Sequence, residues 1–340
     1  MEQLVTEINK MRSQPTPPPP LLLYTAHKTE GIVCGRVSAD GRLAATGDQN
    51  SEVRVWGLCE TRLSPQLHPD YFADARISAY TETLKDSQQQ KEKQWWSLRG
   101  HCDTVYDVVF LSDCEYLISV SFDTTMRLWR MNDFSCAAVY RGHSSPVWGC
   151  AVSPVHNLVA TASSDKTARI WSLDRTYPLR IMAGHLQDVL CVAFHPNGSY
   201  IATGSVDRTV RLWSVTDGSL VRVFGGHPEQ GSVETVAFSP NGQYAASAGS
   251  DKYVWLWDLA GGSLVYQLAG HTSRIVSIDW SHDGSTVSAC SFDGTVLLWS
   301  LDCDMACVGG TKPKKYITKC STLLSLQYST KNALVGVGLA

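Results

Sequence analysis

The chain has 340 residues, 44% of them hydrophobic and 18% charged, and a formal net charge of −3. This length allows one large core or two ordinary domains. The small acidic excess argues against nucleic acid as a direct partner, and no apolar run approaches the ~20 residues needed to cross a membrane. The eleven cysteines are scattered and include no CxxC pair, which predicts reduced thiols and no metal site.

Residues 1–20 are predicted to form a short helix and a linker. Leu4, Ile8 and Met11 fall on one helical face. The run "PTPPPP" then ends the helix and stiffens the link to the next segment. This N-terminus lacks the basic region and apolar stretch of a signal peptide.

An isolated strand, a degraded repeat and an insert come next. "LLLYTA" (Leu21–Ala26) has the pattern of a single strand, and "DQNSEVRVW" ends at Trp56 as a degraded copy of a motif found five more times. Residues 59–94 interrupt the period and are polar, with many Gln and Lys. We expect a mobile excursion between two strands of the first repeat, and a docking peptide remains the alternative interpretation.

The rest of the chain repeats with a period of about 42. Five Gly-His pairs are spaced 42, 42, 42 and 44 residues apart, and each is followed by an Asp in a turn and a Trp six residues later. Every unit contains four short runs of β-branched and apolar residues that are separated by Asn-Gly and Asp turns. A period of this length with four strands is typical of WD40 propellers.

The repeat count predicts an all-β, seven-bladed WD40 β-propeller over residues 21–340. Six units carry a Trp, and the segment after Trp299 has strand character without Trp or Gly-His. We expect the last blade to combine Leu21–Ala26 with roughly residues 318–340 and to be one strand short. Such closure removes exposed sheet edges.

The recurring His, Ser and Asp predict structure and not catalysis. A hydrolase needs one site, whereas this set recurs in four repeats. We expect Asp to fix the imidazole, Ser to bond its other nitrogen, and Trp to donate to Ser. Gly249 replaces the Ser in the unit of His227, so we expect that network to be incomplete. The predicted quartets are His101, Ser121, Asp123 and Trp129; His143, Ser163, Asp165 and Trp171; His185, Ser205, Asp207 and Trp213; and His271, Ser291, Asp293 and Trp299.

The surface positions near each Gly-His and turn Asp are candidate partner contacts. A rigid scaffold presents these loops for recognition, and exposed aromatic and Arg side chains are common anchors of protein interfaces. Trp148 has the alternative of packing within its blade. The candidates are Tyr106, Phe122, Pro146, Trp148, Arg274 and Phe292.

The arginines two residues before each Trp share its strand face. We expect aliphatic stems packed on the blade with solvated heads, and a basic binding stripe is the alternative. These arginines are Arg54, Arg127, Arg169 and Arg211.

One cassette, "DRTYPLRI" (Asp174–Ile181), occurs only once. With "YRGHSSPVWGCAVSP" before it and "LQDVLCVAFHPNGSYIATGSVDRTVRLWS" after it, the block resembles the C-terminal WD40 domain of the fifth-subunit family of TATA-box-binding-protein-associated factors, most closely its SAGA-associated "like" paralogue. In the cassette, Arg175, Tyr177 and Arg180 are candidate partner contacts, and a sturdy turn is the equal alternative.

The resemblance implies a non-catalytic scaffold in a nuclear coactivator complex of TFIID or SAGA type, beside histone-fold subunits and without a cofactor or small-molecule substrate. Members of that family carry a large N-terminal region that this sequence lacks, which predicts a fragment or a shortened form. The rival interpretations are a ubiquitin-ligase substrate receptor or histone-tail reader, which predicts a charged or aromatic cage at the central channel, and an enzyme, which needs a constellation unique to one blade.

Overall fold

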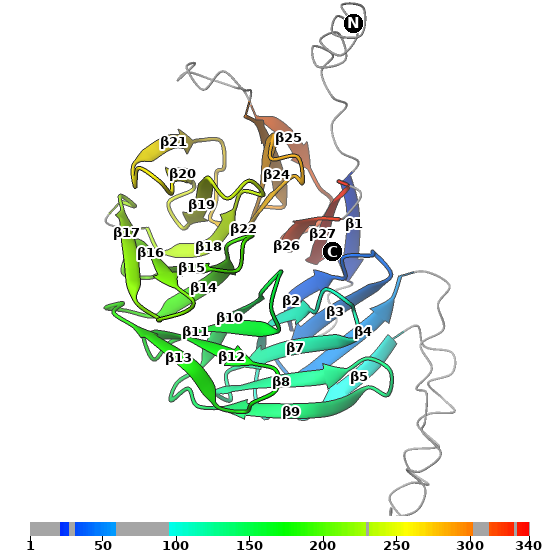
Figure 1. Ribbon diagram of the computed structural model, residues 1–340. Helices are drawn as coiled ribbons and strands as arrows, with labels where there is room; N and C mark the ends of the chain where they lie inside the picture. Colours follow the sequence, from blue (N-terminus) through cyan, green and yellow to red (C-terminus); the bar gives the residue numbers. More distant parts are fainter. Residues whose placement is uncertain are drawn as a thin grey trace, which may run out of the picture.

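The computed structural model describes residues 21–26, 31–58, 95–228, 231–301, 313–329 and 332–339. Over these residues the chain forms seven β-sheets arranged as a ring (Figure 1), which confirms the predicted seven-bladed propeller. No helix long and apolar enough to span a membrane occurs in the part of the chain that the structure describes. The predicted N-terminal helix and the insert of residues 59–94 lie outside these ranges.

Six sheets contain four antiparallel strands in chain order, and each runs from the centre of the ring to its circumference. Their strands are β2 (Ile32–Val37), β3 (Leu43–Asp48), β4 (Glu52–Gly57) and β5 (Trp95–Arg99); β6 (Val105–Phe110), β7 (Tyr116–Ser121), β8 (Thr125–Arg130) and β9 (Ser135–Arg141); β10 (Val147–Val152), β11 (Leu158–Ser163), β12 (Thr167–Ser172) and β13 (Pro178–Ala183); β14 (Val189–Phe194), β15 (Tyr200–Ser205), β16 (Thr209–Ser214) and β17 (Leu220–Gly225); β18 (Val233–Phe238), β19 (Tyr244–Gly249), β20 (Val254–Asp258) and β21 (Leu264–Leu268); and β22 (Ile275–Trp280), β23 (Thr286–Ser291), β24 (Thr295–Ser300) and β25 (Lys314–Ile317).

The core lies between neighbouring blades. The second strand of each four-stranded blade is buried along almost its whole length and is rich in small residues, as in "LVATAS" of β11. Both of its faces are covered because another blade packs on each side. One such interface brings Ile118 and Val120 of β7 against Val147 and Val159 of the next blade.

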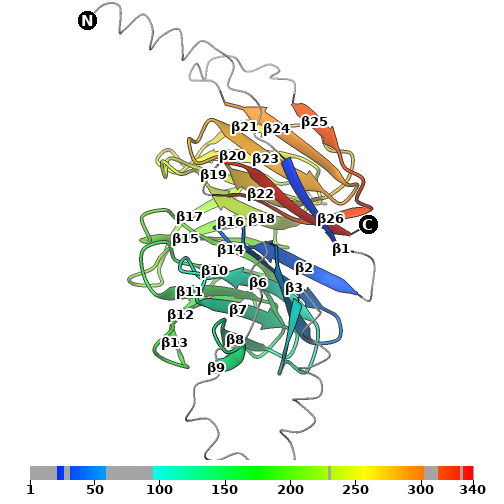
Figure 2. The ribbon, with the colours of Figure 1, turned by 90° about the vertical axis from the view of Figure 1, so that its right-hand side faces the viewer.

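The seventh sheet joins the two ends of the described chain. Its order is β1 (Leu21–Ala26), β27 (Leu334–Leu339) and β26 (Thr322–Tyr328), with β1 parallel to β27. Figure 2 shows the blue strand β1 among the red strands of the C-terminal end. The predicted closure by these segments, one strand short, is therefore confirmed.

Hydrogen bonds from the seventh sheet complete the ring on both sides. Ser325 Oγ donates to the carbonyl of Gly35 in the first blade. On the other side, the backbone N–H of Tyr328 donates to Asp279 Oδ2 over 2.6 Å. Burial raises the pKa of Asp279 to about 6, against the lowering effect of this backbone N–H.

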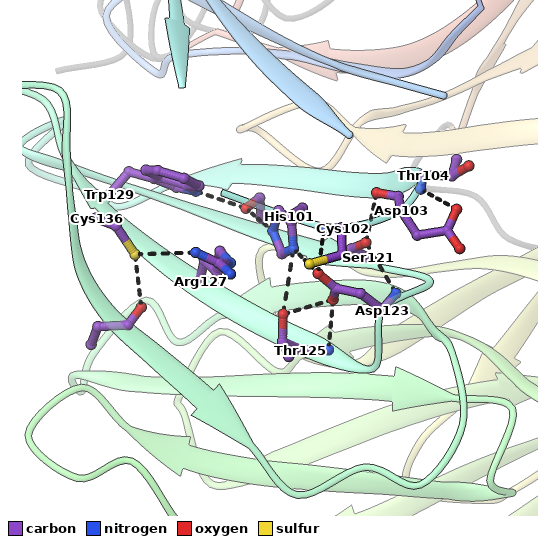
Figure 3. Close-up of polar contacts among 12 residues, drawn as sticks. His101, Cys102, Asp103, Thr104, Ser121, Asp123, Thr125, Arg127, Trp129 and Cys136 are labelled. Carbon is purple, nitrogen blue, oxygen red and sulfur yellow. Dashed lines mark hydrogen bonds and ion pairs between the residues drawn. The ribbon is translucent and has the colours of Figure 1, made fainter. Parts of the chain in front are cut away.

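A buried quartet links the loops of each regular blade. His101 Nδ1 lies 2.8 Å from Asp123 Oδ2, and its Nε2 lies 2.7 Å from the hydroxyl of Ser119, which also accepts a hydrogen bond of 2.8 Å from Trp129 Nε1 (Figure 3). Ser119 is fully buried. The same pattern recurs with the hydroxyls of Thr161, Thr203 and Ser247.

The prediction of the quartet hydroxyl was therefore wrong by two residues. In the ladder Trp129 pairs with Leu117, so the nearest hydroxyl on the same face is that of Ser119. Ser121 lies one strand period farther on, where it donates to the carbonyl of Asp103 at 2.9 Å and accepts the N–H of Asp123 at 3.2 Å. The corresponding hydroxyls likewise bond to loop carbonyls; they are Ser163, Ser205 and Ser291.

The incomplete network is also in a different blade from the one predicted. His227 has a full set of partners, with Asp251 at 2.8 Å and Ser247 at 2.9 Å. The gap lies in the next blade, where Ala289 stands in the hydroxyl position and His271 Nε2 makes no hydrogen bond to the described residues. The Gly249 substitution left the network intact because that position does not contribute the hydroxyl.

The arginines beside each Trp are neither a free basic stripe nor solvated heads. Arg169 Nη2 lies 3.5 Å from Asp165 Oδ2, and its side chain is only 14% exposed. A Cβ on Gly142 would lie 2.9 Å from Arg169 Nη1 and 2.9 Å from the ring of Trp171. The glycine of each Gly-His pair therefore leaves room for the guanidinium.

Restoring the missing hydroxyl tests the quartet. We expect Ala289→Ser to raise the free energy of unfolding by about 1 kcal/mol, because His271 gains a hydrogen bond. In the neighbouring blade, Ser247→Ala is expected to lower it by about 2 kcal/mol, since two buried partners lose theirs. Urea denaturation measures both changes.

A matched control is Ala246→Ser, which places a hydroxyl at another fully buried alanine of the second strand. This variant is expected to be destabilised. Equal destabilisation of the Ala289 and Ala246 variants would show that position 289 has no special place in a quartet.

The incomplete quartet also predicts a dependence of stability on pH. Burial lowers the pKa of His271 to about 4, although the Asp293 carboxylate opposes this shift. The unfolded histidine takes up a proton near pH 6.5, so this residue's contribution is present above 6.5 and is lost as the pH falls towards 4, by on the order of 3 kcal/mol. Urea unfolding from pH 7.5 to 4.5 is expected to give a shallower decline for His271→Asn than for the wild type; parallel curves contradict the prediction.

Candidate protein-binding site

The innermost strands of all seven sheets surround a central channel. A cavity of ≈ 220 Å³ is lined by residues of these strands, including one from the second position of each four-stranded blade. The channel end near the Gly-His loops and Asp turns is called the channel mouth below. The residues at this second position are Val33, Tyr106, Trp148, Leu190, Glu234 and Val276.

Three predicted contact residues meet at the channel mouth. The ring centroids of Tyr106 and Trp148 are 4.6 Å apart in an edge-to-face arrangement, and Phe122 lies 6.3 Å from Tyr106 and 6.5 Å from Trp148. Phe122 comes from the Asp turn of β7–β8 and is 43% exposed. These three residues form what is called the aromatic cluster below, and Trp148 therefore does not simply pack within its own blade.

The other predicted residues of this end are distributed around it. Pro146 is half-buried, and its carbonyl accepts hydrogen bonds from Ser163 and Ser164. Arg274 and Phe292 lie in the sixth blade, where the guanidinium stands 4.7 Å from the ring centroid. The last two are thus a pair of their own and do not join the aromatic cluster.

Charged groups line the channel behind the aromatic cluster. Asp107 accepts backbone N–H groups from Cys150 at 3.1 Å and Val108 at 2.9 Å and faces Arg36 at 3.8 Å. Burial raises the pKa of Asp107, and Arg36 opposes that rise. Burial likewise raises the pKa of Glu234, which forms an ion pair of 4.0 Å with Arg274.

Glu234 was missed from the sequence. It occupies the same strand position as Tyr106 and Trp148, but two extra residues after His227 shift the count from the histidine. Alignment on the first buried Val of the inner strand would have found it.

The cassette "DRTYPLRI" lies on the circumference and not at the channel mouth, because it connects β12 to the outermost strand β13 (Figure 1). Arg175 Nη1 donates to Tyr177 Oη over 3.1 Å, and the Tyr177 side chain is 56% exposed. Arg180 instead donates to the Thr216 carbonyl of the next blade at 3.0 Å. Arg222, at the same place 42 residues on, approaches the hairpin of the following blade at Gly262, so Arg180 has a role in blade packing.

The channel thiols do not suit chemistry. Burial raises the pKa of Cys191 to about 12 and that of Cys34 and Cys150 also well above the ordinary value, so these thiols stay protonated near neutral pH and are poor nucleophiles. Within the described ranges no three His, Cys, Asp or Glu side chains are grouped to hold a metal ion.

These features define a ring of WD-type blades with an exposed aromatic end and buried structural quartets. The comparison with protein families agrees with this class. Residues 147–339, more than half of the chain, match the family described as "Echinoderm microtubule-associated protein second beta-propeller", and residues 19–57 and 92–130 match "WD domain, G-beta repeat". The chain therefore belongs to this family of β-propellers.

The chain is also similar to curated transcription factors. It is 32% identical to "Transcription initiation factor TFIID subunit 5" of Encephalitozoon cuniculi, over 40% of this chain and 24% of that protein. It is 39% identical to mouse "TAF5-like RNA polymerase II p300/CBP-associated factor-associated factor 65 kDa subunit 5L", over 41% and 24%. For "Protein will decrease acetylation" of Drosophila melanogaster the identity is 42%, over 41% and 23%. The resemblance seen in the sequence is thus confirmed, and the matches span about a quarter of the relatives' length.

The two kinds of arginine in the cassette are expected to behave differently. Arg180→Ala should lower the free energy of unfolding by on the order of 0.5–1 kcal/mol, because it removes a hydrogen bond between blades. Arg175→Ala should change it by less than about 0.5 kcal/mol, since its contacts are on the surface. Urea denaturation of both variants checks this, and a larger loss for Arg175→Ala contradicts the assignment.

Proposed function

We propose that this chain is a non-catalytic protein–protein interaction scaffold in a nuclear transcription coactivator assembly of TFIID or SAGA type. In that setting it supports RNA polymerase II transcription and contacts histone-fold subunits. The similarity to the TFIID subunit 5 and TAF5-like proteins supports the assembly. The candidate contacts on this chain are the aromatic cluster, the Arg274–Phe292 pair and the exposed Arg175–Tyr177 pair.

One observation carries the scaffold interpretation. The His, hydroxyl, Asp and Trp groups that resemble catalytic machinery recur from blade to blade, are buried and bond to one another. Side chains satisfied in this way hold blade geometry and have no free position for a substrate. What the described surface offers instead is aromatic and arginine side chains at loops, which favours binding.

A reader of chromatin peptides is the second candidate. The aromatic cluster and channel carboxylates are the kind of cage that this alternative requires. The chain is also 27% identical, over 40% of its length, to a chicken protein that is one of the subunits of "Chromatin assembly factor 1". A ubiquitin-ligase receptor has no comparable support beyond the propeller itself.

Affinity purification of the tagged chain from nuclear extract, followed by mass spectrometry, tests the proposal. We expect histone-fold subunits of a TFIID- or SAGA-type complex to be recovered, and we expect Tyr177→Ala or Phe122→Ala to reduce that recovery at least several-fold, because each removes an exposed aromatic contact. Ser144→Ala, an exposed change in a loop, is the control. Recovery of ligase adaptors without coactivator subunits contradicts the proposal.

A further inference from the structure

We infer that the channel mouth is a receptor for a single arginine side chain of an extended basic peptide, with Glu234 as the acid and the aromatic cluster as the stacking surface. This inference deepens the proposed function and rests on it, because it gives the chemistry of one partner of the scaffold. The shape, the aromatic surface and the charge of the cavity each support it.

The cavity is preformed. Its walls are the seven inner strands, whose alternate residues are buried among the blades, as in Val105, Val147, Val189 and Val233 with no exposed surface. A site on such strands loses little conformational freedom when a ligand binds. The volume of ≈ 220 Å³ suits one inserted side chain and not a folded domain.

The aromatic cluster supplies ring faces at the entrance. The edge-to-face contact between Tyr106 and Trp148 fixes their orientation. Phe122 remains 43% exposed although it touches both rings. Ring faces attract cations as well as apolar groups, and arginine most often among protein cations.

The charge of the lining selects a cation. Its ionisable residues of opposite sign are Arg36 on one side and Asp107 and Glu234 on the other. Asp107 is already held by two backbone N–H groups and Arg36. Glu234 accepts no hydrogen bond from the described residues, and its ion pair with Arg274 spans 4.0 Å. A half-buried carboxylate with one distant partner gains most from a donor that enters the cavity.

Arginine fits this combination better than lysine. Its planar guanidinium can stack on a ring while two N–H groups reach one carboxylate, whereas an ammonium is a strongly hydrated point charge. The same end of the channel already contains one example, since Arg274 lies over Phe292 at 4.7 Å and faces Glu234. The incoming arginine would approach Glu234 from the side of the aromatic cluster.

Fluorescence anisotropy with the full chain tests the inference. The probes are a fluorescein-labelled peptide Gly-Ser-Ala-Arg-Ala-Ser-Gly and the same peptide with lysine or with citrulline, which keeps the shape of arginine without its charge. We expect the citrulline peptide to bind at least about tenfold more weakly, a difference of about 1.4 kcal/mol, and the lysine peptide to lie between. Affinity should fall as salt rises.

Variants identify the residues. Glu234→Gln and Phe122→Ala are each expected to weaken the arginine peptide at least about tenfold, and thermal unfolding verifies that both fold. Tyr177→Ala, on the circumference, is the matched aromatic control and should bind as the wild type does. Equal binding of the citrulline or lysine peptide, or wild-type affinity for Glu234→Gln, overturns the inference.

The result is separable from that of the nuclear-extract experiment. Recovery of coactivator subunits without peptide binding overturns the arginine site and leaves the scaffold. Peptide binding without those subunits leaves the site and removes the proposed assembly.

Discussion

The hydrogen-bonded quartet of Asp, His, hydroxyl and Trp is the interaction on which the rest of the propeller depends. In the second blade it ties the loop of His101 to the turn of Asp123 and to the buried Trp129. All of these groups lie in a low-dielectric interior, where a satisfied network fixes geometry and an unsatisfied one is costly. The quartet therefore holds Phe122, the residue before Asp123, at the channel mouth.

Quartets are complete in the second to fifth blades and missing members where the ring closes. The first blade keeps only the bond of 3.1 Å from Trp56 to Thr46, and the sixth lacks the hydroxyl at Ala289. Near this seam the seventh sheet supplies other bonds, such as that from Tyr328 to Asp279. The stiffest part of the ring is thus the part that carries the aromatic cluster and Glu234, as a preformed site requires.

Periodicity was sufficient to predict the strands, the seven blades and their closure, because each repeats a pattern that burial imposes. It could not identify the quartet hydroxyl, since Ser119 and Ser121 share one strand face and only the pairing of Trp129 with Leu117 distinguishes them. Tyr106 and Phe122 were predictable from their place in the regular spacing of the repeat, whereas Glu234 was hidden by an insertion of two residues. Counting from a loop residue fails when the loop changes length, and counting from a buried strand residue does not.

The cassette that occurs once is largely structural in its backbone and in Arg180, which has a counterpart in Arg222 of the following blade. Tyr140 also anchors its start by donating to the Leu173 carbonyl over 2.8 Å. What remains specific to it is the exposed Arg175–Tyr177 pair on the circumference. Because this pair and the channel mouth lie on different parts of the ring, one partner can occupy each at the same time, and simultaneous occupation of separate surfaces is what distinguishes a scaffold from a simple binding module.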